Sequence, residues 1–441
     1  MDFWIGVAVI ALGLIVSIAL HEIGHLVPAK LSGVKVTDYF VGFGKTLWST
    51  KRGETEYGIK MLPLGGFVRM VGMFPPARTK AGPATPRRGV RGWMDSAADD
   101  ARAFSAEEIQ AGEEHRSFYA QSTPRKLAVM FGGPVMNLII ATVLFAIILT
   151  TFGQMTATNR LGGISECVLP AGEDRECTSS DPAAPAAQAG LQTGDVVRSW
   201  AGMPVADWDD LTAAIAEGGA QEVPVQVERD GEPLDLTITP VMTERPMVDD
   251  DGQVVTDDQG QLVTTQMPFV GVGAQLELQR QPITAVPPMV WEVFTRTVEV
   301  VFTLPQRLVG ITQSVFGDAE REPGVVGLIG VGRFAGEIAS LDMADYGVAE
   351  RTSDMLALIA QLNMALFVFN MVPLLPLDGG HIAGALYEGA RRRLAILFGR
   401  PDPGHVDTAR LMPVTYVVVF FLIGMSLLLA VADIVNPITL T

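Results

Sequence analysis

The chain has 441 residues and a net charge of −17, from 32 Lys and Arg against 49 Asp and Glu. This acidity argues against nucleic acid as a partner, because binding to a phosphate backbone rests mainly on Lys and Arg. Hydrophobic residues make up 48% of the sequence, which favours a protein with both membrane-embedded and aqueous parts. The length allows several domains.

Four apolar segments are long enough to cross a bilayer. We therefore expect a polytopic α-helical membrane protein with transmembrane helices at 1–28, 125–151, 353–381 and 412–433. The segments between these helices differ in composition. In chain order they predict a membrane-associated β element at 29–74, a partly disordered insertion at 75–124, an α+β domain at 160–278 and a surface or amphipathic connector at 284–350.

Charge is distributed unevenly along the chain and predicts its orientation. Residues 27–126 contain 16 Lys and Arg and 10 Asp and Glu, whereas residues 152–288 contain 6 and 22. Positively charged flanks of a transmembrane helix stay in the cytoplasm. We therefore place the 29–124 segment in the cytoplasm, and the 160–278 domain and both termini on the exterior side of a plasma membrane.

The first helix ends with the motif HEIGH, which contains His21, Glu22 and His25. Two histidines four residues apart share one helical face, so both can bind one ion. This is the His-Glu-x-x-His pattern of zinc hydrolases, in which the glutamate is the general base. The alternation of helices across the membrane places Asp378, at the cytoplasmic end of the third helix, at the same depth as these histidines. The sequence therefore predicts a metal site near the cytoplasmic side.

Further polar and small residues lie in the second and third helices. Gly132 and Gly133 would allow another helix to approach closely. Asn137 follows one turn later, and either an interhelical hydrogen bond or a role in the site fits it. His381 follows the LDGG sequence and is expected to be structural or to support a ligand. Two further histidines, His115 and His405, are expected to be ordinary surface residues.

The two cysteines, Cys167 and Cys177, both fall in the acidic segment that we place outside the cell. An even number of cysteines in an exterior domain favours a disulfide that closes a short loop. Two free thiols remain the alternative.

The combination of HEIGH, GGPVMN and LDGG resembles the site-2 protease family, the bacterial intramembrane zinc metalloproteases of peptidase family M50. AAQAGLQTGDVVRSWAGMPV resembles a circularly permuted bacterial PDZ domain, and PLGGFVRM resembles the membrane-associated β element of the same family. With a single recognisable PDZ domain, the order of elements is most similar to actinobacterial members that cleave anti-sigma factors. The 75–114 stretch matches no motif of the family.

The resemblance implies an enzyme that cleaves single-pass, anti-sigma-factor-like membrane proteins within or near their transmembrane segments, in regulated intramembrane proteolysis. It implies Zn2+ held by His21, His25 and Asp378, with Glu22 as the catalytic base. Asn370 would bind the substrate backbone, although a helix–helix hydrogen bond is an equally good account of it. The remaining candidates for substrate binding are Gly65, Gly66 and Asn137. The glycines lie in the β element, whose edge could pair with an extended segment.

Three other functions would each leave a different pattern in the sequence. A membrane metalloprotease for protein quality control would usually take its third ligand from a glutamate on a helix soon after the motif, whereas β and glycine patterns follow here. A catalytically idle PDZ scaffold would not need the intact motif. A metal transporter would need polar residues along several helices, and the fourth helix lacks them. The PDZ domain could bind a C-terminus produced by an earlier cut, or exclude substrates with bulky outer domains.

Overall fold

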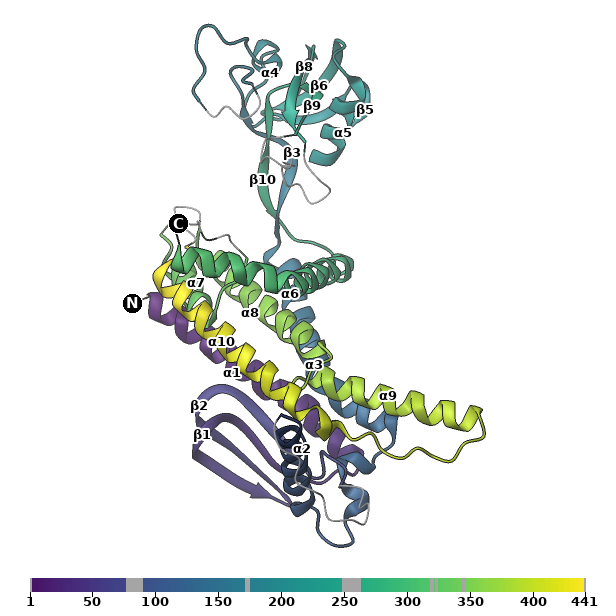
Figure 1. Cartoon of the computed structure of the whole chain (residues 1–441). Coiled ribbons are helices and arrows are strands. Elements are labelled where there is room, and N and C mark those ends of the chain that lie inside the picture. The colour runs from purple at the N-terminus through teal and green to yellow at the C-terminus, as the bar shows by residue number, and fades with distance from the viewer. Residues whose placement is uncertain are drawn as a thin grey trace. The chain divides into compact units, whose positions relative to one another are not determined.

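The computed structural model describes residues 2–76, 90–170, 175–247, 263–317, 321, 324–342 and 346–439. The chain divides into two compact units. The first unit combines Met1–Phe152 with Pro282–Thr441, and the second unit is Gly153–Gln281. Figure 1 shows the elements of both units along the chain.

Within the described residues, four helices of the first unit are long and apolar enough to cross a membrane. They confirm the predicted number of spans. They are α1 (Asp2–Leu31), α3 (Thr123–Ile147, continued by the π-helical turn Ile148–Phe152), α8 (Val348–Met371) and α10 (Met412–Val435, preceded by the 3-10 turn Thr408–Leu411). Many of their apolar side chains are exposed, which suits lipid contact.

The helices α1 and α3 are in backbone contact at two glycines. A Cβ added to Gly132 would lie 1.9 Å from the carbonyl oxygen of Gly24, and one added to Gly24 would lie 2.2 Å from the carbonyl oxygen of Gly132. No side chain other than hydrogen fits either position. The close helix approach predicted from the glycines is therefore confirmed.

The third span ends earlier than predicted. We expected one helix from 353 to 381 that includes LDGG, but α8 stops at Met371 and a separate helix, α9, begins at Asp378 and runs to Leu397. Pro373 and Pro376 explain the break, because each lacks a backbone N–H and the residue before a proline disfavours the helical region. Asp378 is thus the first residue of α9.

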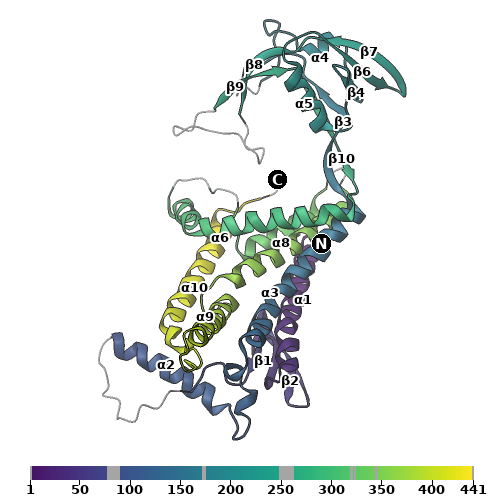
Figure 2. The same ribbon diagram turned by 90° about the vertical axis from the view of Figure 1, so that its right-hand side faces the viewer.

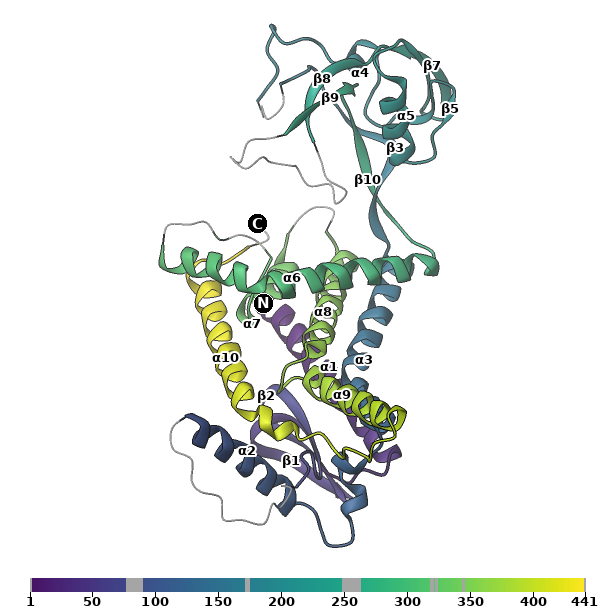
Figure 3. The ribbon, with the colours of Figure 1, turned by 45° about the vertical axis from the view of Figure 1, so that its right-hand side comes forward.

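Residues 284–350, predicted to be a connector, include two helices, α6 (Val286–Phe316) and α7 (Leu328–Ser340). Figure 3 shows α6 lying across the end of the helix bundle. Its first half packs on α3 and α8, and Ile311 in its second half packs on Leu429 of α10. The α7 helix starts at a buried carboxylate, since Asp433 of α10 accepts hydrogen bonds from the N–H groups of Gly327 and Gly330 at 2.9 and 2.8 Å.

The opposite end of the bundle carries the predicted β element (Figure 2). Its strands β1 (Val36–Arg52) and β2 (Thr55–Met70) are both bent. Residues 36–41 pair with residues 66–70 on one side, and residues 38–41 also pair with residues 56–59 on the other. The insertion beside it is more ordered than predicted, because residues 90–107 form the helix α2 (Val90–Glu107) and two 3-10 turns follow. Residues 77–89 of that insertion lie outside the described residues.

The second unit is a mixed α/β domain. Its main sheet has the order β10-β3-β4-β6-β7, with β5 paired to β4, and β8 and β9 form a separate ladder. The elements are β3 (Gln154–Ile164), α4 (Pro185–Gln188), β4 (Val196–Trp200), β5 (Met203–Pro204), α5 (Trp208–Gly218), β6 (Val223–Arg229), β7 (Glu232–Ile238), β8 (Val241–Pro246), β9 (Thr264–Phe269) and β10 (Val272–Gln279). One apolar core, with Trp200 at its centre, joins α5 to this sheet.

A disulfide and a buried ion pair stabilise loops of the second unit. Cys167 and Cys177 are disulfide-bonded, as predicted. Asp195, which is 1% exposed, accepts hydrogen bonds at 2.8 Å from both Nε and a terminal nitrogen of Arg229, and at 2.9 Å from the N–H of Gln192. Burial alone would raise the pKa of Asp195, but these hydrogen bonds outweigh it and hold the pKa below its usual value.

Replacing Asp195 with Asn should lower the free energy of unfolding of this unit by about 2 kcal/mol, because a charged, paired acceptor is lost. Hydrogen exchange of β4 and β6 in the full chain measures this. Because the pKa is lowered in the folded state, the stabilisation is present above the unfolded pKa of about 3.9 and is lost as pH falls through the folded pKa.

The control for this prediction is Glu228→Gln, which removes an exposed pair with Arg198 on the same sheet and should change stability by less than about 1 kcal/mol. Equal effects of the two substitutions would contradict the prediction.

Candidate metal centre

Three side chains from distant parts of the chain meet at the junction of α1, α3 and α9. The Nε2 atoms of His21 and His25 lie 3.3 Å apart, and Oδ2 of Asp378 lies 3.4 Å from the first and 3.3 Å from the second. Within the described residues, this is the cluster of histidine, cysteine and carboxylate side chains that could hold a metal ion. The sequence places the histidines and the aspartate more than 350 positions apart, and the predicted meeting of these residues is confirmed.

These separations fit a zinc ion. Ligands at about 2.0–2.2 Å from a tetrahedral zinc lie about 3.3–3.5 Å from one another, which matches the three distances found. Two imidazoles and one carboxylate are also a donor set that zinc accepts in catalytic sites, where a fourth position is left open. The residues present therefore fit the ion that the sequence motif predicts.

The α3 helix fixes the orientation of His25. Nδ1 of the imidazole lies 2.8 Å from the carbonyl oxygen of Val129, so an N–H there donates to this oxygen and leaves Nε2 free for a metal. Gly133 provides the space for the ring, since a Cβ at this position would lie 2.2 Å from Nε2. The sequence predicted a role for Gly133 in helix packing. It did not predict the contact between Gly133 and the ring of His25.

Asn137 plays the same part for His21. It is 0% exposed, and its amide lies 3.1 Å from Nδ1 of His21. The amide nitrogen faces the ring, and the amide oxygen has no hydrogen-bond partner among the residues that the structure describes. Turning the amide by 180° lets the oxygen accept from Nδ1–H, which is the tautomer that leaves Nε2 for a metal. The two interpretations of Asn137 are thus compatible, because its interhelical hydrogen bond is to a candidate metal ligand.

Glu22 lies half-buried between α1 and the β element. A Cβ added to Gly66 of β2 would lie 2.8 Å from Cγ of Glu22, so the strand backbone runs directly against this side chain. Tyr39 of β1 anchors the element to the same helix through a 2.8 Å hydrogen bond from its hydroxyl to the carbonyl oxygen of Ala19. Burial and the charge of Glu22 raise the pKa of Tyr39 to about 12, so the phenol stays a donor.

The other predicted residues take different places. Asn370 is half-buried near the end of α8 and has no hydrogen-bond partner within the described residues, so the helix–helix alternative is not observed. Gly65 precedes Gly66 and lies against the ring of Phe43, with a φ of 141° that favours glycine. His381 lies in the first turn of α9, behind Asp378.

One expectation about a histidine was wrong. His115 is exposed, but His405 is half-buried and its Nδ1 lies 3.4 Å from Oε1 of Glu388. Glu388 in turn binds Lys126 of α3. Sequence reasoning missed this contact because residues 126 and 388 belong to no common motif.

Removing the support of His21 should weaken metal binding. Asn137→Ala is expected to raise the dissociation constant for zinc about 10- to 100-fold, the usual effect of losing a hydrogen-bond partner of a metal ligand. Competition with a chelator measures this on the purified protein. Asn363→Ala is the matched control, since Asn363 is also 0% exposed and bonds α1 through Ser17 at 2.9 Å without touching a ligand. Equal affinities of the two variants would refute the role of Asn137.

Comparisons with known proteins agree with this geometry. Residues 9–398 match the model of the family described as peptidase family M50. The chain is 34% identical to the zinc metalloprotease Rip1 of Mycobacterium tuberculosis and 33% identical to Rip1 of Mycolicibacterium smegmatis, in both cases over 100% of each chain. It is 23% identical to the regulator of sigma-W protease RasP of Bacillus subtilis, over 84% of this chain and 87% of RasP. The chain therefore belongs to peptidase family M50 and is a zinc metalloprotease.

Proposed function

We propose that this chain hydrolyses peptide bonds within or near the transmembrane segments of single-pass membrane proteins, as part of regulated intramembrane proteolysis. The observation that carries the proposal is the metal-binding geometry of His21, His25 and Asp378 at one end of a bundle of membrane-spanning helices. A hydrolytic centre at this place has its substrates in the bilayer.

The residues have separate roles in this reaction. His21, His25 and Asp378 would hold the zinc, which lowers the pKa of a bound water towards about 7 and polarises the scissile carbonyl. Glu22 would accept the proton of the attacking water and later deliver it to the nitrogen of the leaving amine. The Val129 carbonyl and the Asn137 amide keep the two imidazoles in the tautomer that the ion requires.

The proposed orientation puts the metal centre and the β1–β2 element near the cytoplasm, and the second unit and both termini outside. Lys30 in the last turn of α1, Lys35 after that helix and Arg125 near the start of α3 support it through the positive-inside rule. The disulfide of the second unit supports it independently, since disulfides persist in oxidising compartments.

The edge of β2 is the proposed docking strand for substrate. Residues 66–70 pair only with residues 36–41 within the described part of the chain, which leaves one side of this strand open beside Glu22. An extended segment paired here would present its peptide bonds to the metal centre. Residues 56–59 of β2 pair on both sides, with residues 38–41 and 48–51, so this part of the strand offers no open edge. Gly65, Gly66 and the free amide of Asn370 remain candidates for contacts with the substrate backbone.

The second unit is the proposed PDZ domain, supported by the strand-rich fold around α5 and by the AAQAGLQTGDVVRSWAGMPV sequence. It would either capture a C-terminus left by an earlier cut or exclude substrates with large exterior domains. Anti-sigma factors are the proposed substrates, because one relative is named as a regulator of a sigma factor.

Glu22→Gln should keep the metal but lose catalysis. The amide cannot accept the proton of the attacking water, so cleavage of a single-pass substrate in detergent should fall by about 10²–10⁴-fold. Metal content should stay near one ion per chain, whereas Asp378→Ala should lose the ion. Membrane proteomics of cells that carry Glu22→Gln should show truncated single-pass proteins accumulating, which identifies the substrates. Normal cleavage by Glu22→Gln would contradict the proposal.

Gly66→Ala should impair catalysis without unseating the metal. The new methyl group would meet Cγ of Glu22 at 2.8 Å and the carbonyl oxygen of Phe40 at 3.1 Å, so either the base or the docking strand must move. We expect at least about a tenfold loss in kcat/KM, equivalent to about 1.4 kcal/mol. Gly310→Ala in α6 is the control, because a Cβ there meets nothing within 4 Å. Unchanged turnover by Gly66→Ala would argue against close contact between strand and base.

A further inference from the structure

One face of α3 contacts both histidine ligands. Val129, Gly133 and Asn137 follow one another at intervals of four residues, the spacing that keeps side chains on one side of a helix. Val129 and Gly133 contact His25, and Asn137 contacts His21. Lys126 lies one turn before Val129 on the same face, and it points to a different helix, the one that carries the third ligand.

Asp378 lies at the start of α9, which is not one of the candidate spans. The first turn of this helix is held by close packing, since a Cβ at Gly379 would lie 2.2 Å from the carbonyl oxygen of Val372. That contact is with the short loop after α8, and it does not by itself fix where α9 lies along α3. A second contact further along α9 is needed to set the position of the helix.

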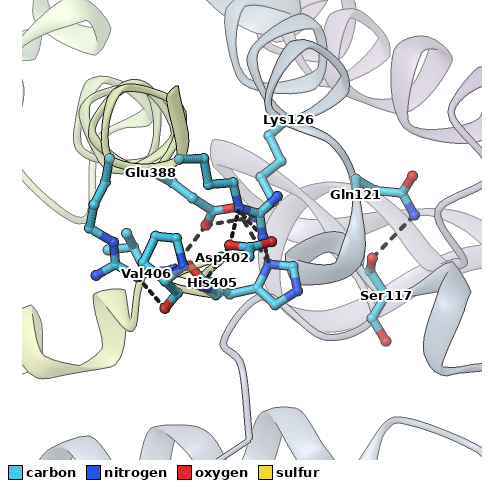
Figure 4. Close-up of polar contacts among 11 residues, drawn as sticks. Ser117, Gln121, Lys126, Glu388, Asp402, His405 and Val406 are labelled. Atoms are coloured by element: carbon cyan, nitrogen blue, oxygen red, sulfur yellow. Dashed lines mark hydrogen bonds and ion pairs between the residues drawn. The ribbon is translucent and has the colours of Figure 1, made fainter. Parts of the chain in front are cut away.

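Glu388 provides that contact, about 15 Å along α9 from Asp378. Its two carboxylate oxygens each accept a hydrogen bond from Nζ of Lys126 at 3.0 Å. The side chains of Lys126 and Glu388 are 6% and 3% exposed. Figure 4 shows this pair together with His405 and Val406, two residues of the loop after α9 that contact the carboxylate of Glu388.

The carboxylate of Glu388 is fully engaged. The N–H of Val406 donates to Oε2 at 3.0 Å, and a terminal nitrogen of Arg392 lies 3.3 Å from Oε1. Burial alone would raise the pKa of Glu388, but hydrogen bonds from His405, Val406 and Lys126 outweigh it and lower the pKa to about 2. Glu388 therefore carries its charge at any pH at which the enzyme would work.

A buried ion pair is a weak source of stability, because desolvation offsets most of the attraction. Its clearest use in proteins is to specify register, since a buried charge tolerates no position without its partner. Apolar contacts alone would permit α9 to slide along α3 by small amounts. The pairing of Lys126 with Glu388 prevents this sliding, because it would leave both buried charges without a partner.

We propose that Lys126 and Glu388 are positioning residues of the metal centre, which fix α9 along α3 and so hold Asp378 opposite His21 and His25. On this basis α3 aligns all three ligands, two by direct contact and the third through the ion pair. The inference rests on the proposed metal site and adds to it a residue pair that touches no ligand.

Cobalt substitution tests the proposal with a readout besides activity. The full chain is purified in detergent and loaded with Co2+, and its visible absorption reports the number and type of ligands. Asp378→Asn gives the reference spectrum for a disturbed third ligand. Glu388→Gln and Lys126→Met should change the spectrum in the same direction as Asp378→Asn and weaken Co2+ binding about tenfold. Lys126→Arg keeps the charge and should retain the original spectrum.

Glu388→Asp is the milder variant if Glu388→Gln does not fold. It keeps the charge but shortens the side chain by one methylene, so the pair can close only if α9 shifts, and the spectrum should again change.

Asp433→Asn is the matched control. Asp433 is also a buried carboxylate, paired at 2.8 Å with Arg321, but it joins α10 to α7 away from the metal. This variant should lose thermal stability without a spectral change. An unaltered spectrum and Co2+ affinity in both Glu388 variants, or equal changes in Asp433→Asn, would overturn the inference and leave the metal site intact. Failure of the unsubstituted protein to bind Co2+ would overturn the proposed function as well.

Discussion

The metal centre depends on the backbone contact between α1 and α3. Gly24 and Gly132 permit the two helices to touch, and only at this separation does the carbonyl of Val129 reach Nδ1 of His25. Gly133 then leaves just enough room for the imidazole ring. In a bilayer, where helix association relies on close packing and hydrogen bonds, such a contact determines how the polar groups of the two helices pair.

Several polar groups near the site are paired across elements, in an apolar environment where an unsatisfied group would cost several kcal/mol. Asn363 donates to Ser17 of α1, Asn137 contacts His21, and Tyr39 donates to the carbonyl of Ala19. Each of these bonds joins α1 to a different neighbour. The helix that carries the histidines is therefore held by hydrogen bonds to α8, α3 and the β element.

Much of the site could be read from the sequence because its signals are local. HEIGH places two imidazoles on one helical face. The charges that flank the spans predict that Asp378 lies at the same depth in the membrane. The glycines of α3 predicted a close helix contact. The break between α8 and α9 was missed although Pro373 and Pro376 signal it, because the apolar run continues through both prolines to Leu377. The helix α2 was missed although its apolar residues recur every three to four positions, because the Pro-, Gly- and charge-rich composition of the whole insertion outweighed that local pattern.

The pairing of Lys126 with Glu388 shows the limit of such reasoning. The two residues are 262 positions apart, and neither belongs to a periodic pattern that points to the other. On the inference above, their contact sets where α9 lies along α3, and no local pattern in the sequence points to it. The pair therefore becomes visible only in the folded chain.

The separation of the ligands along the chain has a consequence for biosynthesis. The two histidines leave the ribosome early, whereas Asp378 follows only after the whole of the second unit has been made. On the proposed ligand set, a partly synthesised protein would carry just two of the three ligands. The proposed centre is therefore complete only late in translation, after α1, α3 and α8 have been made.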